Sequence, residues 1–148
     1  MELLQAFGRL DQDARYMRFM RFVSAPDLAR LRQVLASFPE HGIGIVATVP
    51  ADDGIDIVGS AIAVFAHGQP VCEFAITVAS AFGGTGLGTV LMRTLIDEAT
   101  RRGMREMEGF VLATNPSMLR LATRLGFGIA RDRDDPSIRV CRLKLAAP

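Results

Sequence analysis

A glycine-dense run near the middle of the chain restricts its possible folds more than any other feature. Within residues 81–89 the chain carries four glycines: Gly83, Gly84, Gly86 and Gly88. The run follows an apolar, alternating segment at 72–78 and precedes a segment of helical periodicity at 90–102. A strand, a glycine turn and a helix in this order predict a phosphate-binding site. Glycine lets the backbone approach an anion closely, and the first N–H groups of the helix point at it.

The spacing of the glycines decides which phosphate-bearing ligand the turn can hold. A P-loop ends in Gly-Lys-Ser/Thr, and here Gly88-Thr89 lacks the lysine. No register of the four glycines supplies the Gly-x-Gly-x-x-Gly of dinucleotide-binding folds. The spacing that fits is x-x-Gly-x-Gly, ending at Gly86 and Gly88, which resembles the acyl-CoA-binding turn of the GNAT family of acetyltransferases. An ordinary glycine-rich turn is the alternative at this point.

The length and charge of the chain limit its class. Its 148 residues, 49% of them apolar, suffice for one domain with a hydrophobic core, which we place at 1–148. The formal net charge of +1, with acids and bases interspersed, gives no support for a nucleic-acid or membrane partner. No apolar run approaches the roughly 18 residues that span a bilayer. The charged residues near the start exclude a secretory signal, so we expect a cytoplasmic protein.

The two cysteines, Cys72 and Cys141, stand alone in strand-like apolar segments. Cysteine is often buried without a redox role, so we expect two buried thiols in a reducing compartment. No group of Cys and His has the spacing of metal ligands, and no metal site is expected.

Periodicity and turn signals place helices first and a sheet afterwards. Three short helices are expected before Pro39, the third opened by Ser24 as its N-cap. The remaining elements are strands at 42–49, 55–66, 71–78, 106–113, 127–130 and 137–145, and helices at 90–102 and 115–125. This order predicts a mixed α/β (α+β) domain.

A second motif follows the strand expected at 106–113. The chain there reads Asn115-Pro116, and the next helix ends in Leu125-Gly126-Phe127. This looks like the second cofactor motif of GNAT enzymes, in which the Asn side chain touches the pantetheine arm. An Asn before a Pro also fits a plain helix N-cap, and one residue can serve both roles.

A carboxylate inside an otherwise apolar strand is the third signal. Alternation along 71–78 places Glu73 on the face opposite Cys72 and Phe74. A carboxylate in a central strand is costly unless it is paired. Glu73 is therefore a structural partner of an arginine, a residue of a solvated sheet face, or a general base. A base would take a proton, directly or through water, from an amine attacking a thioester.

Three segments carry a closer resemblance: Arg15-Tyr16-Met17-Arg18-Phe19, Cys72-Glu73-Phe74-Ala75 with Val78, and Gly109-Phe110-Val111-Leu112 with Asn115, Met118 and Leu119. They look like the acetyltransferase domain of bacterial protein lysine acetyltransferases, which modify metabolic enzymes such as acyl-CoA synthetases. The resemblance covers essentially the whole chain. It implies a GNAT-like mixed, mainly antiparallel sheet with splayed central strands, flanked by helices.

This resemblance implies that the protein binds acetyl-CoA and transfers the acetyl group to a primary amine, possibly a protein lysine. Glu73 would be the general base, and the Val78 N–H would be a single-donor oxyanion hole. The expected cofactor contacts are the end of the strand, the glycine run and the Asn of the second motif: Ile76, Thr77, Val78, Gly83, Gly84, Thr85, Gly86, Leu87, Gly88, Thr89 and Asn115.

The chain departs from the family pattern at three positions. Gly83 stands where the family usually has Gln or Arg, and Thr85 where it often has a basic residue, so modest cofactor affinity is expected. Ala122 stands where many GNAT enzymes carry the tyrosine that protonates the leaving thiolate. These departures leave open an acyl-CoA-sensing regulatory domain without turnover. An acetyltransferase for a small amine or antibiotic is a third possibility.

The family also opens with a strand before its first helix, whereas this chain starts at that helix. The strand at 42–49 would then be a sheet edge without charges or an internal proline, which is a template for another strand. We therefore expect a homodimer in which two copies pair at this edge. The alternative is that the helix expected at 2–9 covers the edge.

Overall fold

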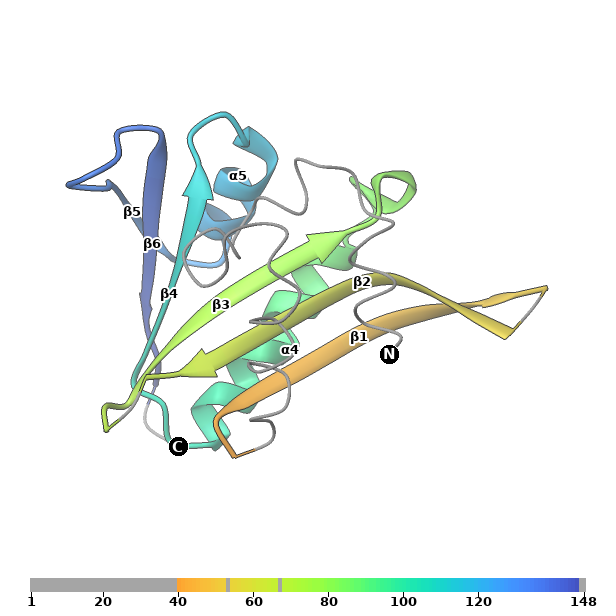
Figure 1. Ribbon diagram of the computed structural model, residues 1–148, viewed down its shortest axis with the longest axis horizontal. Helices are drawn as coiled ribbons and strands as arrows, with labels where there is room; N and C mark the ends of the chain where they lie inside the picture. The colour runs from red at the N-terminus through yellow and green to blue at the C-terminus, as the bar shows by residue number, and fades with distance from the viewer. Residues whose placement is uncertain (1–39, 53, 67, 147–148) are drawn as a thin grey trace.

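The computed structural model describes residues 40–52, 54–66 and 68–146, so the three helices expected before Pro39 lie outside it. The described part contains one six-stranded sheet and two α-helices (Figure 1). The strands are β1 (Gly42–Ala51), β2 (Gly54–Phe65), β3 (Val71–Val78), β4 (Glu106–Leu112), β5 (Gly128–Arg131) and β6 (Ile138–Lys144). The helices are α4 (Leu87–Arg101) and α5 (Pro116–Arg124), with a short 3-10 turn, η1, at Ser80–Phe82.

The sheet consists of two antiparallel halves joined by one short parallel contact. The strand order is β1-β2-β3-β4-β6-β5, and every neighbouring pair is antiparallel except β3 and β4. These two strands pair only over 71–73 and 106–108. Figure 1 shows them diverging beyond this point. The predicted mixed, mainly antiparallel sheet with splayed central strands is therefore confirmed.

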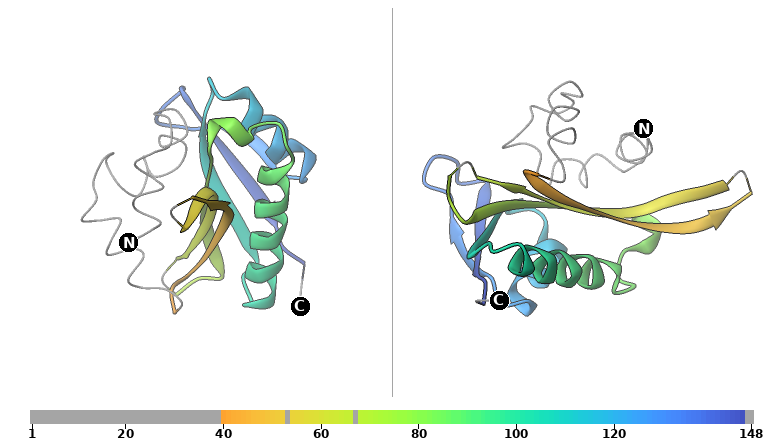
Figure 2. Two further views of the ribbon diagram at one scale, coloured as in Figure 1. Left: turned by 90° about the vertical axis from the view of Figure 1, so that its right-hand side faces the viewer. Right: turned by 90° about the horizontal axis from the view of Figure 1, so that it is seen from below.

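Both helices cover the same face of the sheet, as the two views of Figure 2 show. The apolar side of α4, which includes Leu91 and Leu95, is buried in one core with Phe74 of β3 and Met107 of β4. The predicted alternation of β3 is confirmed, because Phe74 faces this core while Glu73 lies on the opposite face.

Gly109 permits a close contact beneath the point where β3 and β4 separate. A Cβ atom on Gly109 would lie 2.2 Å from Cε2 of Phe74, so the Phe74 ring occupies the place of a side chain. This ring is 1% exposed, and it meets Phe127 edge-to-face with ring centroids 5.3 Å apart. The packing fills the core where the sheet loses its pairing.

Helix α4 begins earlier than periodicity predicts, at Leu87 instead of Val90. The reason is Gly86, whose φ of 89° ends the turn and makes it the N-cap. The Val90 N–H then donates to the Gly86 carbonyl oxygen at 3.1 Å. Leu87, Gly88 and Thr89, which the sequence placed in the turn, therefore form the first turn of the helix.

Both cysteines are buried, as predicted. Burial raises the pKa of the Cys72 thiol to about 12 and that of Cys141 to about 11. Neither described helix is long and apolar enough to cross a bilayer. Within the described ranges, no three His, Cys, Asp or Glu side chains gather as a metal site would require.

Candidate active site

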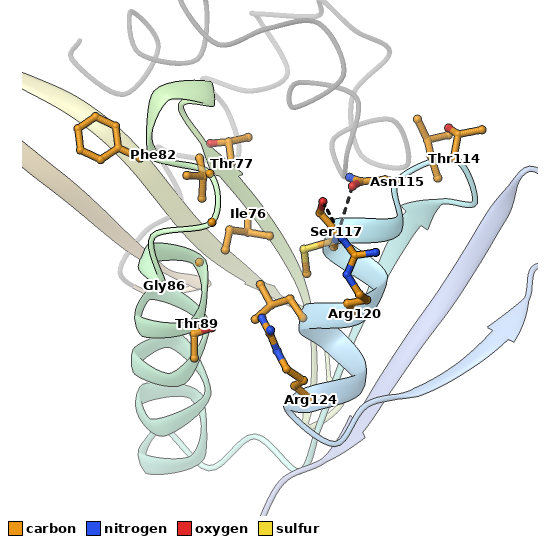
Figure 3. A pocket seen from close by; sticks show the side chains of 17 residues that line it. Ile76, Thr77, Phe82, Gly86, Thr89, Thr114, Asn115, Ser117, Arg120 and Arg124 are labelled. Carbon is orange, nitrogen blue, oxygen red and sulfur yellow. Dashed lines mark hydrogen bonds between the residues drawn. The ribbon is translucent and has the colours of Figure 1, made fainter.

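A cavity of about 520 Å³ lies where β3 and β4 separate. Its walls are the end of β3, the glycine turn, the first turn of α4 and one side of α5 (Figure 3). Of the predicted cofactor-binding residues, only Thr85 and Leu87 do not line it. Among the described residues, two arginines line the cavity and no Asp or Glu does.

The backbone of β3 turns hydrogen-bonding groups toward this cavity. The Ala79 N–H donates to the Val58 carbonyl oxygen at 2.8 Å, so Ala79 faces β2. Backbone groups alternate in direction along an antiparallel strand. The N–H groups of Ile76 and Val78 therefore point to the β4 side, beyond the last residues that β3 and β4 pair. The Val78 N–H is thus directed as an oxyanion donor requires.

Thr77 lines the cavity but differs from its two neighbours. By the same alternation, its backbone groups face β2. Its hydroxyl lies 2.9 Å from the Ser60 hydroxyl, and the residue is 3% exposed. Thr77 therefore holds the two strands together and has little capacity left for a ligand.

The glycine turn presents backbone rather than side chains to the cavity. Gly84 and Gly86 have φ angles of 76° and 89°, and an added Cβ would meet nothing within 4 Å at either position. Thr85 stabilises the turn from within, since its hydroxyl donates to the Phe82 carbonyl oxygen at 2.6 Å. The first turn of α4 contains no acidic residue. Its N–H groups and helix dipole therefore favour an anion at this end, and the binding of a phosphate there stays a prediction.

Gly88 has a packing role that the sequence did not indicate. A Cβ on Gly88 would lie 3.1 Å from Cδ2 of Leu121 on α5. Glycine at this position lets the two helices approach each other beside the cavity. The sequence predicted Gly88 only as part of the phosphate turn. Its packing role was not predicted, because periodicity alone cannot show which residue of another helix it would meet.

Asn115 is the N-cap of α5, as one of its two predicted roles requires. Its side-chain oxygen accepts from the Met118 N–H at 3.2 Å, and Pro116 occupies the first helical position. Asn115 also lines the cavity, where Figure 3 shows it close to Ser117. Capping is therefore confirmed, and the contact with a pantetheine arm stays a prediction.

Arg120 and Arg124 line the cavity and were not among the predicted site residues. They lie four positions apart on α5, and Figure 3 shows both side chains at the edge of the cavity. The spacing was visible in the sequence. Their place at the cavity was not, because it depends on α5 lying beside the first turn of α4.

Glu73 does not line the cavity. Its Cα partners are Val64 of β2 and Glu108 of β4, on the sheet face opposite the helices. Ile76, the nearest cavity-lining residue on the strand, is three positions away, which is about 10 Å along a strand. Glu108 in turn accepts from the Arg142 Nε at 3.1 Å. Glu73 thus lies apart from the residues that line the cavity, and its role as a base stays a prediction.

The position expected to carry a thiolate acid is apolar and buried. Ala122 is 0% exposed, packs in the main core and does not line the cavity. In the part of the chain that the structure describes, the cavity has no tyrosine.

A sheet that splits between β3 and β4, with a glycine turn and a helix N-terminus at the split, is the arrangement that the sequence resemblance predicted. The chain belongs to the acetyltransferase (GNAT) family, whose model matches residues 11–127, and it is accordingly an acyltransferase. It is 35% identical over 141 residues to acetyltransferase PA5475 of Pseudomonas aeruginosa. That alignment covers 95% of this chain and 76% of the relative.

Solved structures share the fold. The GNAT domain of S. lividans PAT superposes with a TM-score of 0.73 and 21% identity, over 97% of this chain and 84% of that one. The yncA protein of Salmonella typhimurium, determined with its cofactor acetyl-CoA, gives a TM-score of 0.62 and 25% identity. The match covers 81% of this chain and 76% of the yncA chain.

Proposed function

We propose that this protein transfers the acetyl group of acetyl-CoA to a primary amine, with a protein lysine as the most specific candidate acceptor. The observation that carries the proposal is a single cavity that joins the N-terminus of α4 to the unpaired side of β3. A phosphate group at the helix end and a thioester at the strand would both fit there, as an acyl-CoA requires.

The residues present fit this cosubstrate. Gly84 and Gly86 leave open space beside the backbone, so phosphate oxygens can approach the N–H groups of the turn and helix. The lining has positive side chains and, among the described residues, no negative ones. The outward N–H groups of Ile76 and Val78 can bond to the pantetheine arm and the thioester.

In the proposed reaction the amine nitrogen attacks the thioester carbonyl carbon, the C–S bond breaks and the thiolate leaves. The Val78 N–H donates to the carbonyl oxygen as negative charge develops on it. Glu73 accepts the amine proton through water, because the sheet places it outside the cavity. An ordinary thiol has a pKa of about 8.5, so the thiolate can leave without a dedicated acid. This is compatible with Ala122.

A second candidate function is an acyl-CoA sensor without turnover. The buried Ala122 and the position of Glu73 outside the cavity favour it. Steady-state release of CoA separates the two functions. We expect release that depends on an added amine, tested with a panel of peptide lysines and small amines. Tight binding of CoA without release for any amine would favour the sensor.

We also propose a cytoplasmic location and a homodimer. Two reduced cysteines fit a cytoplasmic location. Strand β1 is one of the two outer strands of the described sheet, and its Val46 is 48% exposed, which fits pairing of two copies at this edge.

The phosphate site is tested by replacing Gly86 with valine. The new side chain would enter the cavity and block close approach to the backbone, weakening CoA binding by about 2 kcal/mol, the scale of a lost charge-assisted hydrogen bond. Gly103→Val is the matched control. Gly103 has a φ of 88° and no neighbour within 4 Å, but it follows the opposite end of α4. Equal CoA affinity in a folded Gly86→Val protein would refute the phosphate site.

A further inference from the structure

Two glutamates lie side by side on the sheet face opposite the helices. Glu73 of β3 and Glu108 of β4 are Cα partners in the short stretch where these strands still pair. Their neighbours Phe74 and Met107 are buried in the core beneath the helices, so both carboxylates project from the other face. Neighbouring strands lie about 4.8 Å apart, which makes the two side chains direct neighbours.

An arginine completes this row on the next strand. Arg142 of β6 is the Cα partner of Glu108, and its Nε donates to a Glu108 carboxylate oxygen at 3.1 Å. Figure 1 shows β3, β4 and β6 side by side in this order. The ion pair therefore forms a dipole across the sheet. Its negative end lies on the strand next to Glu73, and its positive end lies one strand farther away.

The stability of the fold does not explain this arrangement. The Glu108 side chain is 24% exposed and that of Arg142 is 60% exposed, and ion pairs of such exposure contribute little to stability. Like charges on directly paired residues of neighbouring strands are destabilising. The pair therefore places a carboxylate where its charge opposes that of Glu73.

The remaining charged groups on this face, among the described residues, lie one row away. Glu106 of β4 and Lys144 of β6 are Cα partners of each other. On its other side Glu73 pairs with the uncharged Val64 of β2. In the described sheet, Glu108 is therefore the charged residue placed directly beside Glu73.

A neighbouring negative charge changes a carboxylate in the direction that a general base requires. An ordinary glutamate has a pKa of about 4.3, which makes it a weak base for an amine proton. A like charge within about 4–6 Å favours the protonated form and raises the pKa. A general base is most effective when its pKa lies near the operating pH.

We propose that the Glu108–Arg142 ion pair strengthens Glu73 as the base that accepts the amine proton. The inference rests on the proposed function and adds two residues to its mechanism. Glu108 is a positioning residue, because its charge acts through Glu73. Arg142 holds the Glu108 carboxylate in place and moderates its effect. When the amine attacks, its N–H bond breaks and the proton passes to Glu73, which becomes a neutral carboxyl group beside the Glu108 charge.

Carbon-13 NMR of the glutamate carboxyl groups measures the protonation of Glu73 directly, and Glu73→Gln assigns its signal. Glu108→Gln removes the like charge and should lower the titration midpoint of Glu73 by about one pH unit. Arg142→Gln leaves the Glu108 charge uncompensated. It should raise the midpoint by about half a pH unit, since the arginine lies one strand farther away. Arg142→Lys should restore the wild-type midpoint.

Helix α4 supplies matched controls. Arg101 donates to Glu98 at the same distance of 3.1 Å, in another exposed ion pair. This pair belongs to the helix that covers the opposite face of the sheet (Figure 2). Glu98→Gln and Arg101→Gln should therefore leave the midpoint of Glu73 unchanged.

The pH profile of kcat tests whether the coupling reaches the reaction. At saturating acetyl-CoA and amine, the acidic limb should move in the same direction as the NMR midpoint. It should move to lower pH in Glu108→Gln and to higher pH in Arg142→Gln. A merely structural role of the ion pair would lower kcat in both variants without shifts of opposite sign.

Two results overturn the inference. Either the midpoint of Glu73 is the same in the wild type, Glu108→Gln and Arg142→Gln, or it moves as expected while the acidic limb of kcat stays in place. Absence of amine-dependent CoA release from the wild type refutes the proposed function instead, and the NMR shifts then report the electrostatic coupling alone.

Discussion

Replacing Gly109 with alanine is expected to destabilise the protein by about 2 kcal/mol. The new Cβ would lie 2.2, 2.3 and 2.6 Å from three carbons of the Phe74 ring, whereas carbon atoms in contact lie about 3.5–4.0 Å apart. The ring would have to move by more than about 1 Å, yet it is 1% exposed and packs against Phe127. Overpacking of this kind costs up to about 3 kcal/mol, and alanine recovers up to about 1 kcal/mol of backbone entropy.

Urea denaturation measures this difference, with Gly128→Ala as the control. Gly128 is an exposed strand glycine whose added Cβ would find its nearest neighbour, the Arg142 carbonyl oxygen, at 3.9 Å. We expect that control to stay within about 0.5 kcal/mol of the wild type. Combining Gly109→Ala with Phe74→Leu should reduce the cost of the alanine by about 1 kcal/mol or more, because the ring is gone. A Gly109→Ala protein as stable as the wild type, or strictly additive losses, would refute the reasoning.

Three further predictions concern the base, the thiols and the edge strand. Glu73→Gln should lower kcat by about 10²–10⁴ with acetyl-CoA affinity nearly intact, and full activity in steady-state assays would leave Glu73 a structural residue. Cys72 and Cys141 should resist a thiol reagent at pH 8 until the protein is unfolded. Burial raises their pKa values to about 12 and about 11, so little thiolate is present at this pH. Rapid labelling of the native protein would contradict this prediction. Light scattering at micromolar concentration should detect a dimer that Val46→Lys dissociates, and a wild type that stays monomeric when concentrated would exclude it.

Features with a local cause could be predicted from the sequence. The bounds of β3 were predicted without error because apolar alternation and flanking turns coincide there. Asn115 was recognised as a cap from the following Pro116. The glycine turn was located correctly, although Gly86 starts α4 before its apolar periodicity begins. In each case the signal lies within a few neighbouring residues.

Features that depend on the placement of two elements could not be predicted. Gly88 and Leu121 belong to different helices, and their contact follows from the packing of both on one sheet face. The same placement brings Arg120 and Arg124 to the wall of the cavity. For Glu73, alternation predicted the correct face of the sheet, but it could not predict that the residue lies apart from the cavity.

Along β3, side chains alternate between the two faces of the sheet, and backbone N–H groups alternate between the two neighbouring strands. These two patterns explain how one strand can serve both substrates of the proposed reaction. Side chains and backbone groups both repeat every second residue. The side chains of Ile76 and Val78 therefore pack in the core, while their N–H groups point into the gap beside β4. The partly buried Val78 side chain, packed against the core, thus fixes the direction of the proposed oxyanion donor, as electrostatic preorganisation requires. Glu73 projects from the other face of the same strand, so the gap between β3 and β4 is where a thioester could meet an amine approaching from that face.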